Sequence, residues 1–406
     1  MALEEIFTRR FLSAGVSRDL LLAHSQFLHT GIQAELLAEL HLEGSANIRP
    51  VETPAFLSYP QEWCLSQWKD TLISFLSLEL LANEAGLTHS AINIFDFHFS
   101  GGKVRAWAYP ALEALKPKEA DQRWSAFNTF ANELLAPTLL LAGEGNVTDK
   151  LLSSESGPLS ETFWGSAESV WPALINAARK MAGSERPAGL IEQVLELILD
   201  LRARPRSSEP KATDEGALAK DLFSQKQDVL DRFFSKRKFG MLFDLNAGRG
   251  EFSRLIEPYG KIVVALDTDH DRVDENYQLS QYKGVQRSQV IPLMGDIVTP
   301  ATLDRPEALP IEERATPDIA LVLSADGIAP SVNSLARLIK RLADMRCEVL
   351  IEAGAPASPV HDPLAAQTGA EYSKSTFEQV ICEDFRIKES FPIDQGDRQL
   401  YRLTLN

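Results

Sequence analysis

The sequence predicts an α/β protein of two domains, with a mainly helical first half and a second half built on a mostly parallel sheet. Three observations predict this class. Apolar residues recur at helical spacing in the first half, short apolar segments alternate with helical ones in the second half, and a segment rich in proline, serine and charge lies between them. A chain of 406 residues has room for two domains.

The first half, residues 1–202, is predicted to be mainly helical. Residues 72–81 and 190–201 show the clearest helical spacing of leucine, isoleucine and valine. The exception is residues 92–108, where apolar side chains alternate on both sides of a Ser-Gly-Gly sequence at residues 100–102. Such alternation is typical of a β-hairpin, so we expect one small hairpin within a helical domain.

The boundary between the domains is predicted at residues 203–216, ARPRSSEPKATDEG. Proline, serine and charged residues interrupt all periodicity there, as is typical of an inter-domain linker. All six tryptophans precede this segment and none follows it. We therefore expect a helical domain in residues 1–202 and a second domain in residues 217–406.

The second half is predicted to alternate strands and helices. The apolar segments expected to form strands are residues 240–245, 261–266, 290–294, 319–323 and 348–353. One helix is expected to begin at residue 251. Three further helices are expected in residues 271–281, 332–343 and 376–382. Two final segments, residues 385–391 and 398–405, are close enough to pair as antiparallel strands. This alternation predicts parallel strands with crossover helices, whose ligands bind at the carboxyl ends of the strands.

Charge and composition exclude several classes of function. The net charge of -16 is spread along the chain, with 18 basic and 27 acidic residues in residues 1–214 and 23 and 30 in residues 215–406. Both halves would repel a phosphate backbone, so we expect no nucleic-acid partner. One basic cluster is expected to be a solvated helix end rather than a phosphate site. Its members are Arg232, Lys236, Arg237 and Lys238.

The sequence also predicts a cytoplasmic protein without a membrane anchor. No apolar run reaches the ~18 residues that a membrane span needs. The N-terminal segment MALEEIFTRR carries acidic residues where a signal peptide carries only positive charge. Three scattered cysteines are too few for a disulfide framework or a metal site, which favours a reducing compartment.

The most informative segment for function is residues 244–253, which follows a predicted strand and opens a predicted helix. Its glycines, Gly248 and Gly250, would let the backbone turn tightly and approach a ligand. The dinucleotide pattern GxGxxG requires a glycine where this chain has Ser253. That difference weighs against an NAD-dependent oxidoreductase.

Acidic residues follow the next two predicted strands. Asp267 ends the second strand, where a carboxylate can accept hydrogen bonds from both hydroxyls of a ribose. Asp296 follows the third strand, where it could accept from an exocyclic amine or simply cap a helix. A metal site formed by Asp267, Asp269, His270 and Asp271 is less favoured, because Asp269 and Asp271 also suit the first turn of the next helix.

The order of these elements, with the terminal strand pair, resembles the class I S-adenosylmethionine (SAM)-dependent methyltransferases over about residues 217–406. The resemblance implies a Rossmann-like sheet whose last strand is inserted antiparallel beside the fifth, and it implies SAM as the cofactor. It implies that the glycine loop surrounds the methionine part of SAM, that Asp267 holds the ribose, and that Asp296 and Ile297 hold the adenine. The cofactor-binding residues so implied are Asp244, Asn246, Ala247, Gly248, Gly250, Asp267, Thr268, Asp296 and Ile297.

A narrower resemblance, to the nodulation-type host-specificity methyltransferases and their bacterial relatives, spans nearly the whole chain. In the first half it rests on three segments, which are residues 59–63 (YPQEW), residues 68–70 (WKD) and residues 86–93. In the second half it rests on Phe377-Glu378 and on residues 398–401, RQLY.

The chain departs from that narrower family at three places on the substrate side. Residues 105–108 (RAWA) replace a Phe-Ile-Asp sequence after the hairpin, and the linker replaces an aromatic segment. Residues 324–328 (SADGI) stand where the family has a His-His pair before a helix. Either the substrate differs or catalysis has been lost.

Asp326 and His361 are the candidate catalytic residues. Asp326 follows the fourth predicted strand, where a carboxylate could take a proton from the methyl acceptor or orient it, although an Asp-Gly pair could equally be a plain turn. His361, in the loop after the fifth strand, could be a second base or a solvated loop residue. Trp63 and Glu62 could shape an acceptor pocket, although an aromatic core suits Trp63 better.

The sequence therefore predicts methyl transfer from SAM to an oxygen or nitrogen of a small metabolite or biosynthetic intermediate. No metal is required, because SAM already carries an activated methyl group. The alternative is a catalytically inactive pseudo-methyltransferase that acts as a structural partner in an enzyme complex. The expected partner is accordingly a small-molecule acceptor or another protein.

Overall fold

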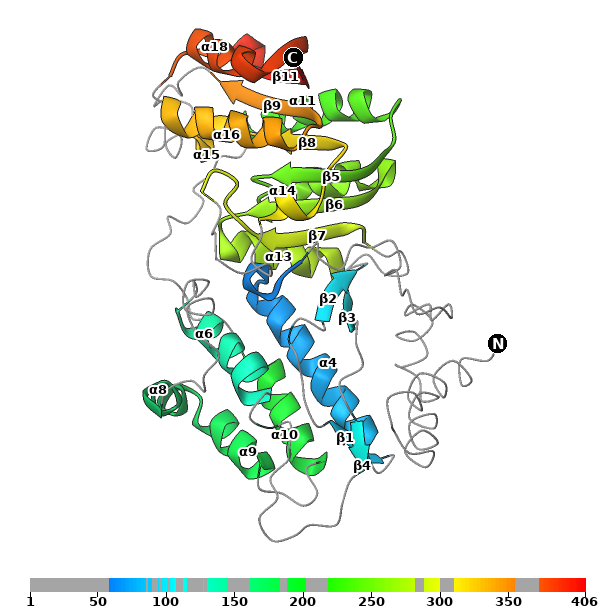
Figure 1. Cartoon of the computed structure of the whole chain (residues 1–406), viewed down its shortest axis with the longest axis vertical. Helices are drawn as coiled ribbons and strands as arrows, with labels where there is room; N and C mark the ends of the chain where they lie inside the picture. The colour runs from blue at the N-terminus through cyan, green and yellow to red at the C-terminus, as the bar shows by residue number, and fades with distance from the viewer. Residues whose placement is uncertain are drawn as a thin grey trace, which may run out of the picture. The chain divides into compact units, whose positions relative to one another are not determined.

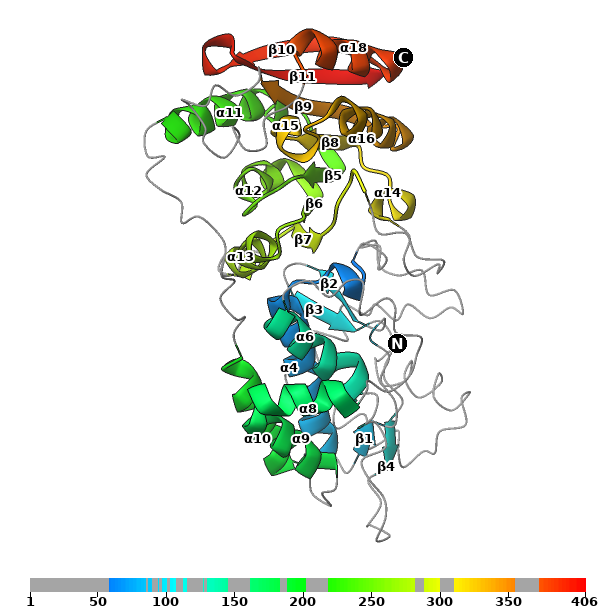
Figure 2. The ribbon, with the colours of Figure 1, turned by 90° about the vertical axis from the view of Figure 1, so that its left-hand side faces the viewer.

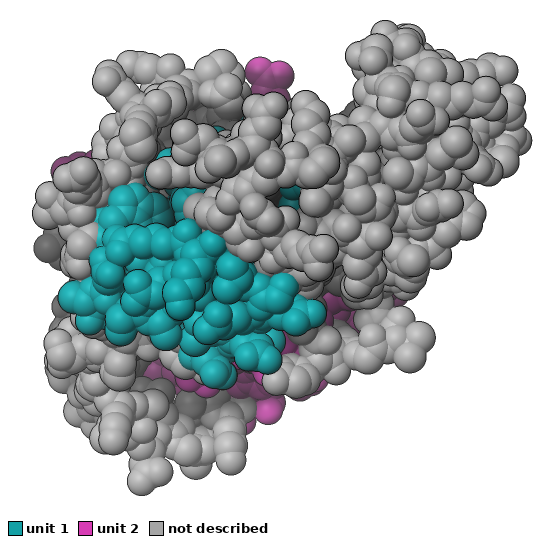
Figure 3. Space-filling model, turned by 90° about the horizontal axis from the view of Figure 1, so that it is seen from below, with its two compact units in different colours: residues 1–205 teal, residues 206–406 magenta. Residues whose placement is uncertain are grey.

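The structure is a computed structural model of the chain. It describes residues 58–84, 87–89, 94, 97–100, 103–106, 112–114, 127, 130–144, 161–182, 188–201, 218–281, 288–299, 310–354 and 372–406. The chain divides into two compact units, Met1–Pro205 and Arg206–Asn406, which are coloured separately in Figure 3. The division falls within residues 203–216, and that segment itself lies outside the described residues.

The first unit is mainly helical. Its helices are η2 (Pro60–Glu62), α4 (Leu65–Glu84), η4 (Phe130–Leu135), α6 (Ala136–Glu144), α8 (Glu161–Val170), α9 (Pro172–Ala182) and α10 (Ala188–Leu199). The two segments with the clearest helical spacing lie in α4 and α10, so both predictions are confirmed. Lys69 of α4 donates from Nζ to the carbonyl oxygen of Leu201, 2.8 Å away, which fastens α4 to the end of α10.

The predicted hairpin is present in the first unit. Strand β2 (Phe97–Ser100) pairs antiparallel with β3 (Lys103–Ala106), and Ser100 lies opposite Lys103 across the turn. A second antiparallel pair, β1 (Leu87–His89) with β4 (Leu112–Ala114), was not predicted. Strands of three residues are too short to show alternation, so the sequence carried no signal for them.

Trp63 belongs to an aromatic core of the first unit. Its side chain is 1% exposed, and its ring lies edge-on to the rings of Trp68 and Phe99, with centroids 5.2 and 5.0 Å away. Such edge-to-face pairs add stability beyond the area they bury. Glu62 accepts a hydrogen bond from the backbone N–H of Tyr59 at 2.9 Å and so closes the turn before Trp63.

The second unit alternates helices and strands as predicted. Its strands are β5 (Phe239–Leu245), β6 (Gly260–Asp267), β7 (Val290–Met294), β8 (Ile319–Val322), β9 (Glu348–Gly354), β10 (Phe385–Ile393) and β11 (Arg398–Leu405). Its helices are α11 (Leu218–Phe234), α12 (Glu251–Ile256), α13 (His270–Gln281), α14 (Ile311–Arg314), α15 (Ala325–Ile328), α16 (Val332–Asp344) and α18 (Lys374–Asp384), with short 3-10 turns at Glu257–Tyr259 and Asp394–Gly396.

The strands form one seven-stranded sheet in the order β10-β11-β9-β8-β5-β6-β7 (Figure 1). The five strands from β9 to β7 are parallel, and β11 is inserted antiparallel between β9 and β10. Both the parallel core and the antiparallel insertion were predicted. The order reverses direction at β5, whose neighbours are β6 and β8, so the carboxyl end of β5 is the switch point where ligands bind in such sheets.

Helices cover both faces of this sheet. Figure 2 shows α11, α12 and α13 on one face and α14 and α16 on the other, where α18 packs on α16. Strands buried on both faces have continuous apolar runs, which is why residues such as Leu242, Val263 and Leu350 have no exposed surface. The two layers of helices leave the carboxyl ends of β5, β6 and β8 as the place for a site.

The basic cluster at the end of α11 makes contacts within its own unit. Arg237 Nη1 lies 2.7 Å from an oxygen of Glu348, and its guanidinium stacks over the Phe233 ring at 4.0 Å. Lys238 Nζ donates to the carbonyl oxygen of Pro258 at 3.3 Å. These contacts agree with the expectation that the cluster is a helix end rather than a phosphate site. Among the described helices, none is long and apolar enough to cross a membrane.

Limited proteolysis should cut the chain first within residues 203–216, because little in that segment can be buried. Gel electrophoresis with mass spectrometry should then show two fragments. All six tryptophans should remain in the N-terminal fragment, so tryptophan fluorescence identifies it. First cleavage within residues 240–300 would show that the boundary is misplaced.

Candidate functional site

Asp244 and Ser253 hold the strand end and the following helix together at the switch point. Asp244, on β5, is 1% exposed, and the Ser253 hydroxyl of α12 donates to its Oδ2 at 2.5 Å. Burial raises the pKa of Asp244 to about 7, partly offset by the Ser253 hydrogen bond, while the charges of Asp267 and Glu251 raise it further. Ser253 thus has a structural role at the position where the dinucleotide pattern would place glycine.

The loop after β5 is fastened to β6 by backbone hydrogen bonds. The N–H groups of Asn246 and Ala247 both donate to the carbonyl oxygen of Leu266, at 2.9 and 2.8 Å. Asn246 has a φ of 72°, in the left-handed region that asparagine tolerates better than most side chains. Its amide nitrogen also donates to the carbonyl oxygen of Leu323 at 3.3 Å, which links the loop to the end of β8.

Gly248 brings the loop onto Asp267. The N–H of Gly248 donates to Asp267 Oδ2 at 2.8 Å, and the N–H of Asp269 donates to Oδ1 at 2.8 Å. Gly248 has a φ of 57°, and a Cβ built on it would meet no atom within 4 Å. A carboxylate oxygen can accept two hydrogen bonds, so each oxygen of Asp267 retains room for one more donor. Open space beside Gly248 and two remaining acceptor positions fit a ribose diol.

Packing requires glycine at residue 250. It has a φ of 72°, and its Cβ would lie 2.1 Å from Oδ1 of Asn276, a buried residue of α13. Arg254 holds that amide in place by donating to Asn276 Oδ1 at 2.8 Å. Packing is therefore a reason for glycine at residue 250 that the sequence did not show, and the expected approach of Gly248 and Gly250 to a ligand stays a prediction.

Asp296 lies beside Asp267 but is bonded to its own turn. The N–H of Gly295 donates to the carbonyl oxygen of Asp267 at 3.0 Å, which places the end of β7 next to the end of β6. Asp296 Oδ1 accepts from the N–H of Val298 at 2.8 Å, and the Thr299 hydroxyl donates to Oδ2. The described residues after Asp296 form a turn rather than a helix, so its hydrogen bonds close a turn instead of capping a helix, and the adenine contact stays a prediction.

The remaining implied cofactor residues differ in exposure. Ile297 is buried, at 6% exposed, and Thr268 is exposed. The acidic residues near Thr268 cap α13, since Asp269 Oδ1 accepts from the N–H groups of Asp271 and Arg272 at 2.9 and 3.2 Å. No group of three potential metal ligands occurs in the part of the chain that the structure describes.

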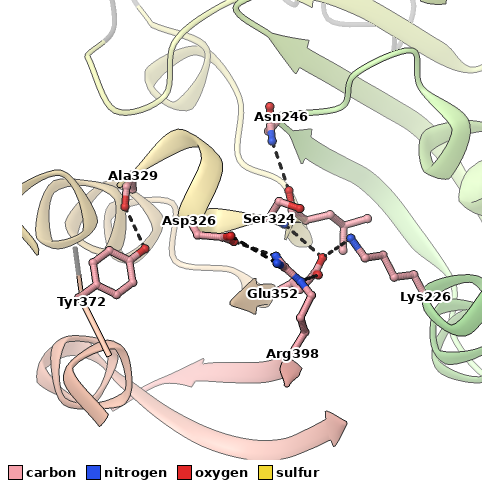
Figure 4. A network of polar contacts seen from close by, with 9 residues as sticks. Lys226, Asn246, Ser324, Asp326, Ala329, Glu352, Tyr372 and Arg398 are labelled. Carbon is pink, nitrogen blue, oxygen red and sulfur yellow. Dashed lines mark hydrogen bonds and ion pairs between the residues drawn. The ribbon is translucent and has the colours of Figure 1, made fainter. Parts of the chain in front are cut away.

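At the carboxyl ends of β8 and β9, four charged side chains form one network (Figure 4). Glu352 of β9 lies between Lys226 Nζ at 2.7 Å and Arg398 Nε at 2.5 Å. Arg398 also reaches Asp326, with Nη2 2.9 Å from Oδ1 and Nη1 3.4 Å from Oδ2. The N–H of Ser324 donates to Glu352 Oε2 at 3.2 Å.

The network keeps Glu352 and Arg398 charged. Burial by itself would raise the pKa of Glu352, which has no exposed side-chain surface, but the charges and hydrogen bonds of Lys226 and Arg398 bring it below its usual value. Burial would likewise lower the pKa of Arg398, but Glu352 and Asp326 raise it above the ordinary value. Each buried charge is therefore compensated by a partner of opposite sign.

Gly354 makes room for the arginine of this network. It lies opposite Arg398 across the β9–β11 pair, and its Cβ would be 2.8 Å from Arg398 Nη1. A side chain at residue 354 would therefore push the guanidinium away from its two carboxylates. The antiparallel insertion of β11 thus delivers Arg398 to the site.

Of the two candidate catalytic residues, the structure describes Asp326. Asp326 lies in α15, a short helix rather than a plain turn, and both its oxygens face one guanidinium. Tyr372 lies beside this helix and donates to the carbonyl oxygen of Ala329 at 2.9 Å (Figure 4). Burial, followed by the charge of Asp326, raises the pKa of Tyr372, so its phenol stays protonated. His361 lies outside the described residues.

Sequence reasoning did not identify Lys226 or Arg398 as site residues. The short match at residues 398–401 included Arg398 but gave it no partner. Lys226 carried no signal, because one lysine in an amphipathic helix is normally a surface residue. The distance along the chain from Lys226 or Arg398 to Glu352 is too great for any spacing rule.

The second unit has the fold of the class I SAM-dependent methyltransferases. Five parallel strands with a final strand inserted antiparallel beside the fifth define that sheet, and the glycine loop and Asp267 lie at its switch point. The fold predicted from the resemblance is therefore confirmed for residues 218–406 as far as they are described.

No family model and no curated protein matches this chain. Solved structures of the same class do match. N-methyltransferase NodS from Bradyrhizobium japonicum is 14% identical, with 45% of this chain and 96% of that chain covered and a TM-score of 0.35. Magnesium protoporphyrin IX methyltransferase (ChlM) from Synechocystis, with bound S-adenosylhomocysteine (SAH), is 12% identical, with 48% and 90% covered and a TM-score of 0.37.

A TehB-like SAM-dependent methyltransferase from Corynebacterium glutamicum is 11% identical, with 45% and 88% covered and a TM-score of 0.32. Each of these likenesses covers about half of this chain. The narrower resemblance of the first half to nodulation-type methyltransferases therefore stays a prediction.

Replacing Gly250 by alanine should destabilise the second unit by about 2–4 kcal/mol, because a left-handed backbone and a contact with Asn276 both oppose a Cβ. Gly248→Ala is the matched control, since it shares the positive φ but meets no atom, and should cost only about 1–2 kcal/mol. Urea unfolding, followed by far-UV circular dichroism, measures the loss of unfolding free energy in each variant. Equal losses would contradict the packing role of Gly250.

Asp244→Asn should change how stability depends on pH. The folded-state pKa of Asp244, about 7, lies above the ordinary 3.8, so its contribution is fully present below about pH 4 and is lost as the pH rises through 7. From pH 5 to pH 8 the wild type should therefore lose about 2–3 kcal/mol relative to the variant.

Urea unfolding at the two pH values measures this difference. Asp228→Asn, on the exposed side of α11, is the control and should follow the wild type. A constant difference between wild type and Asp244→Asn across this range would show that Asp244 does not bind a proton more tightly in the folded state.

Proposed function

We propose that this protein transfers a methyl group from SAM to an oxygen or nitrogen of a small metabolite or biosynthetic intermediate. The observation that carries the proposal is Asp267 at the switch point of the sheet. The glycine loop is folded onto its carboxylate, and each of its oxygens has one acceptor position left. A diol beside an adenosyl group is the ligand that this pair of acceptors suits.

The chain's own residues supply binding and orientation. Asp267 would accept from the ribose hydroxyls, Asp296 and Ile297 would lie against the adenine, and the loop from Asp244 to Gly250 would enclose the methionine part. Bound SAM supplies a methyl group on a sulfonium, already activated for transfer. Alignment of the methyl acceptor with that group is then the main requirement.

Asp326 would orient the methyl acceptor rather than take its proton. Its two oxygens already face Arg398, and protonation would break that ion pair. A paired carboxylate can still accept one hydrogen bond from an N–H or O–H group. His361, which follows β9 in the sequence, remains the proposed proton acceptor.

The second candidate is an inactive pseudo-methyltransferase that serves as a structural partner. One observation favours it, namely that Asp326 and Glu352 are both engaged in ion pairs at the acceptor end. Calorimetry with SAM and SAH, followed by mass spectrometry of a small-molecule extract incubated with the protein, separates the two. Binding with a methylated product supports the enzyme, whereas binding without any product favours the structural partner.

Asp267→Ala should weaken SAM binding by at least ~10-fold, since two charge-assisted hydrogen bonds to the ribose are lost. Asp269→Ala is a matched control, because Asp269 also accepts from two backbone N–H groups but is not expected to contact the cofactor. Calorimetry on both variants, with circular dichroism to verify folding, measures the effect. Wild-type affinity in a folded Asp267→Ala protein would exclude the proposed cofactor site.

A further inference from the structure

We infer that the acceptor end of this sheet takes a methyl acceptor that is uncharged at its reacting end. This inference rests on the proposed function. It follows from the network of Lys226, Glu352, Arg398 and Asp326, which contains two cations and two anions and has no net charge. Every charge in it has an opposite partner within 2.9 Å.

The four side chains are shielded from solvent, so their charges are poorly screened by water and salt. Their side-chain exposures are 10% for Lys226, 0% for Glu352, 14% for Arg398 and 13% for Asp326. A charged group brought beside them would lose hydration, which is costly. The network is already neutral, so it would offer that charged group no net electrostatic attraction to compensate for the lost hydration. An uncharged group loses much less hydration free energy when it is brought beside the network.

The other groups around the network do not change this balance. Tyr372, near Asp326, is a neutral phenol that donates to a backbone carbonyl. Among the described residues at this edge, the further carboxyl groups of Asp244, Asp267 and Asp296 lie at the ends of β5, β6 and β7, which is the side assigned to the cofactor.

The network also defines what each residue does during transfer. Arg398 is a positioning residue that fixes Asp326, and Asp326 accepts a hydrogen bond from the N–H or O–H of the methyl acceptor. The lone pair of the acceptor atom forms the bond to the methyl carbon, and the electron pair of the broken C–S bond stays on sulfur. The acceptor's proton passes to a proton acceptor outside the network, either the proposed His361 or water. No carboxylate of the network has to change its charge.

The affinity ratio of SAM to SAH tests the charge balance without an identified acceptor. SAM is a sulfonium cation and SAH a neutral thioether, so their ratio reports the electrical potential near the sulfur. Arg398→Gln leaves the network with one excess negative charge and should shift the ratio toward SAM by about 3- to 10-fold. Asp326→Asn leaves one excess positive charge and should shift it toward SAH by a similar factor.

Three further variants serve as controls. The double variant Asp326→Asn/Arg398→Gln restores neutrality and should return the ratio to the wild-type value. Arg398→Lys keeps the charge and should leave the ratio unchanged. Arg402→Gln removes a charge from the same strand, but Arg402 pairs with Glu348 at the opposite end of β9, so the ratio should again be unchanged.

Calorimetry at pH 7.5 in low salt measures these ratios, and circular dichroism verifies folding. If Arg398→Gln does not fold, Asp326→Asn compared with the double variant still decides the question. A wild type that binds neither ligand overturns the proposed function and this inference with it. A wild type that binds both, with single variants that shift the ratio in the same direction, overturns this inference alone.

The chemical class of the acceptor is tested with SAM that carries an isotope-labelled methyl group. The protein is incubated with this SAM and the small-molecule fraction of a cell extract, and products are separated by ion exchange and identified by mass spectrometry. Label on a hydroxyl or neutral amine supports the inference. Label on a carboxylate or phosphate oxygen overturns it while supporting methyl transfer, and SAM binding without labelled product overturns both.

Discussion

A buried carboxylate determines the arrangement of one whole end of the sheet. Glu352 has no exposed side-chain surface, and an unpaired charge in such a place costs several kcal/mol. Lys226 reaches it from the helix before the sheet and Arg398 from the strand inserted beside β9. Asp326 then balances the second cation. Removal of any one member leaves an uncompensated charge, so helix α11, strand β11 and the short helix α15 are fixed together.

The cofactor end of the sheet is organised by backbone hydrogen bonds instead of ion pairs. Asp267 is held by two N–H groups, and Asn246 and Ala247 share one carbonyl oxygen of β6. The two ends are joined by the side chain of Asn246, which donates to the backbone after β8. A glycine at this loop position would satisfy the left-handed backbone but could not make that connection, so asparagine gives the loop both features.

The five parallel strands could be predicted because each contains an apolar run between turn residues, whereas the antiparallel place of β11 was implied by the resemblance. Asp267 could be predicted as well, since its place depends only on where its own strand ends. The network at the acceptor end could not be predicted, because Arg398 lies 72 residues from Asp326 and 46 residues from Glu352 along the chain. Only the register of β11 against β9 brings them together. The packing role of Gly250 was hidden for the same reason, as its neighbour Asn276 belongs to another helix.

The place of β11 in the sheet has a consequence for folding during synthesis. Strand β9 has an unpaired edge until β11 is available, and β10 can join the sheet only through β11. The ribosome therefore releases five parallel strands before the strand that covers their edge, and an open edge invites pairing with other chains. This interval during synthesis is therefore when the edge of β9 is open to such pairing.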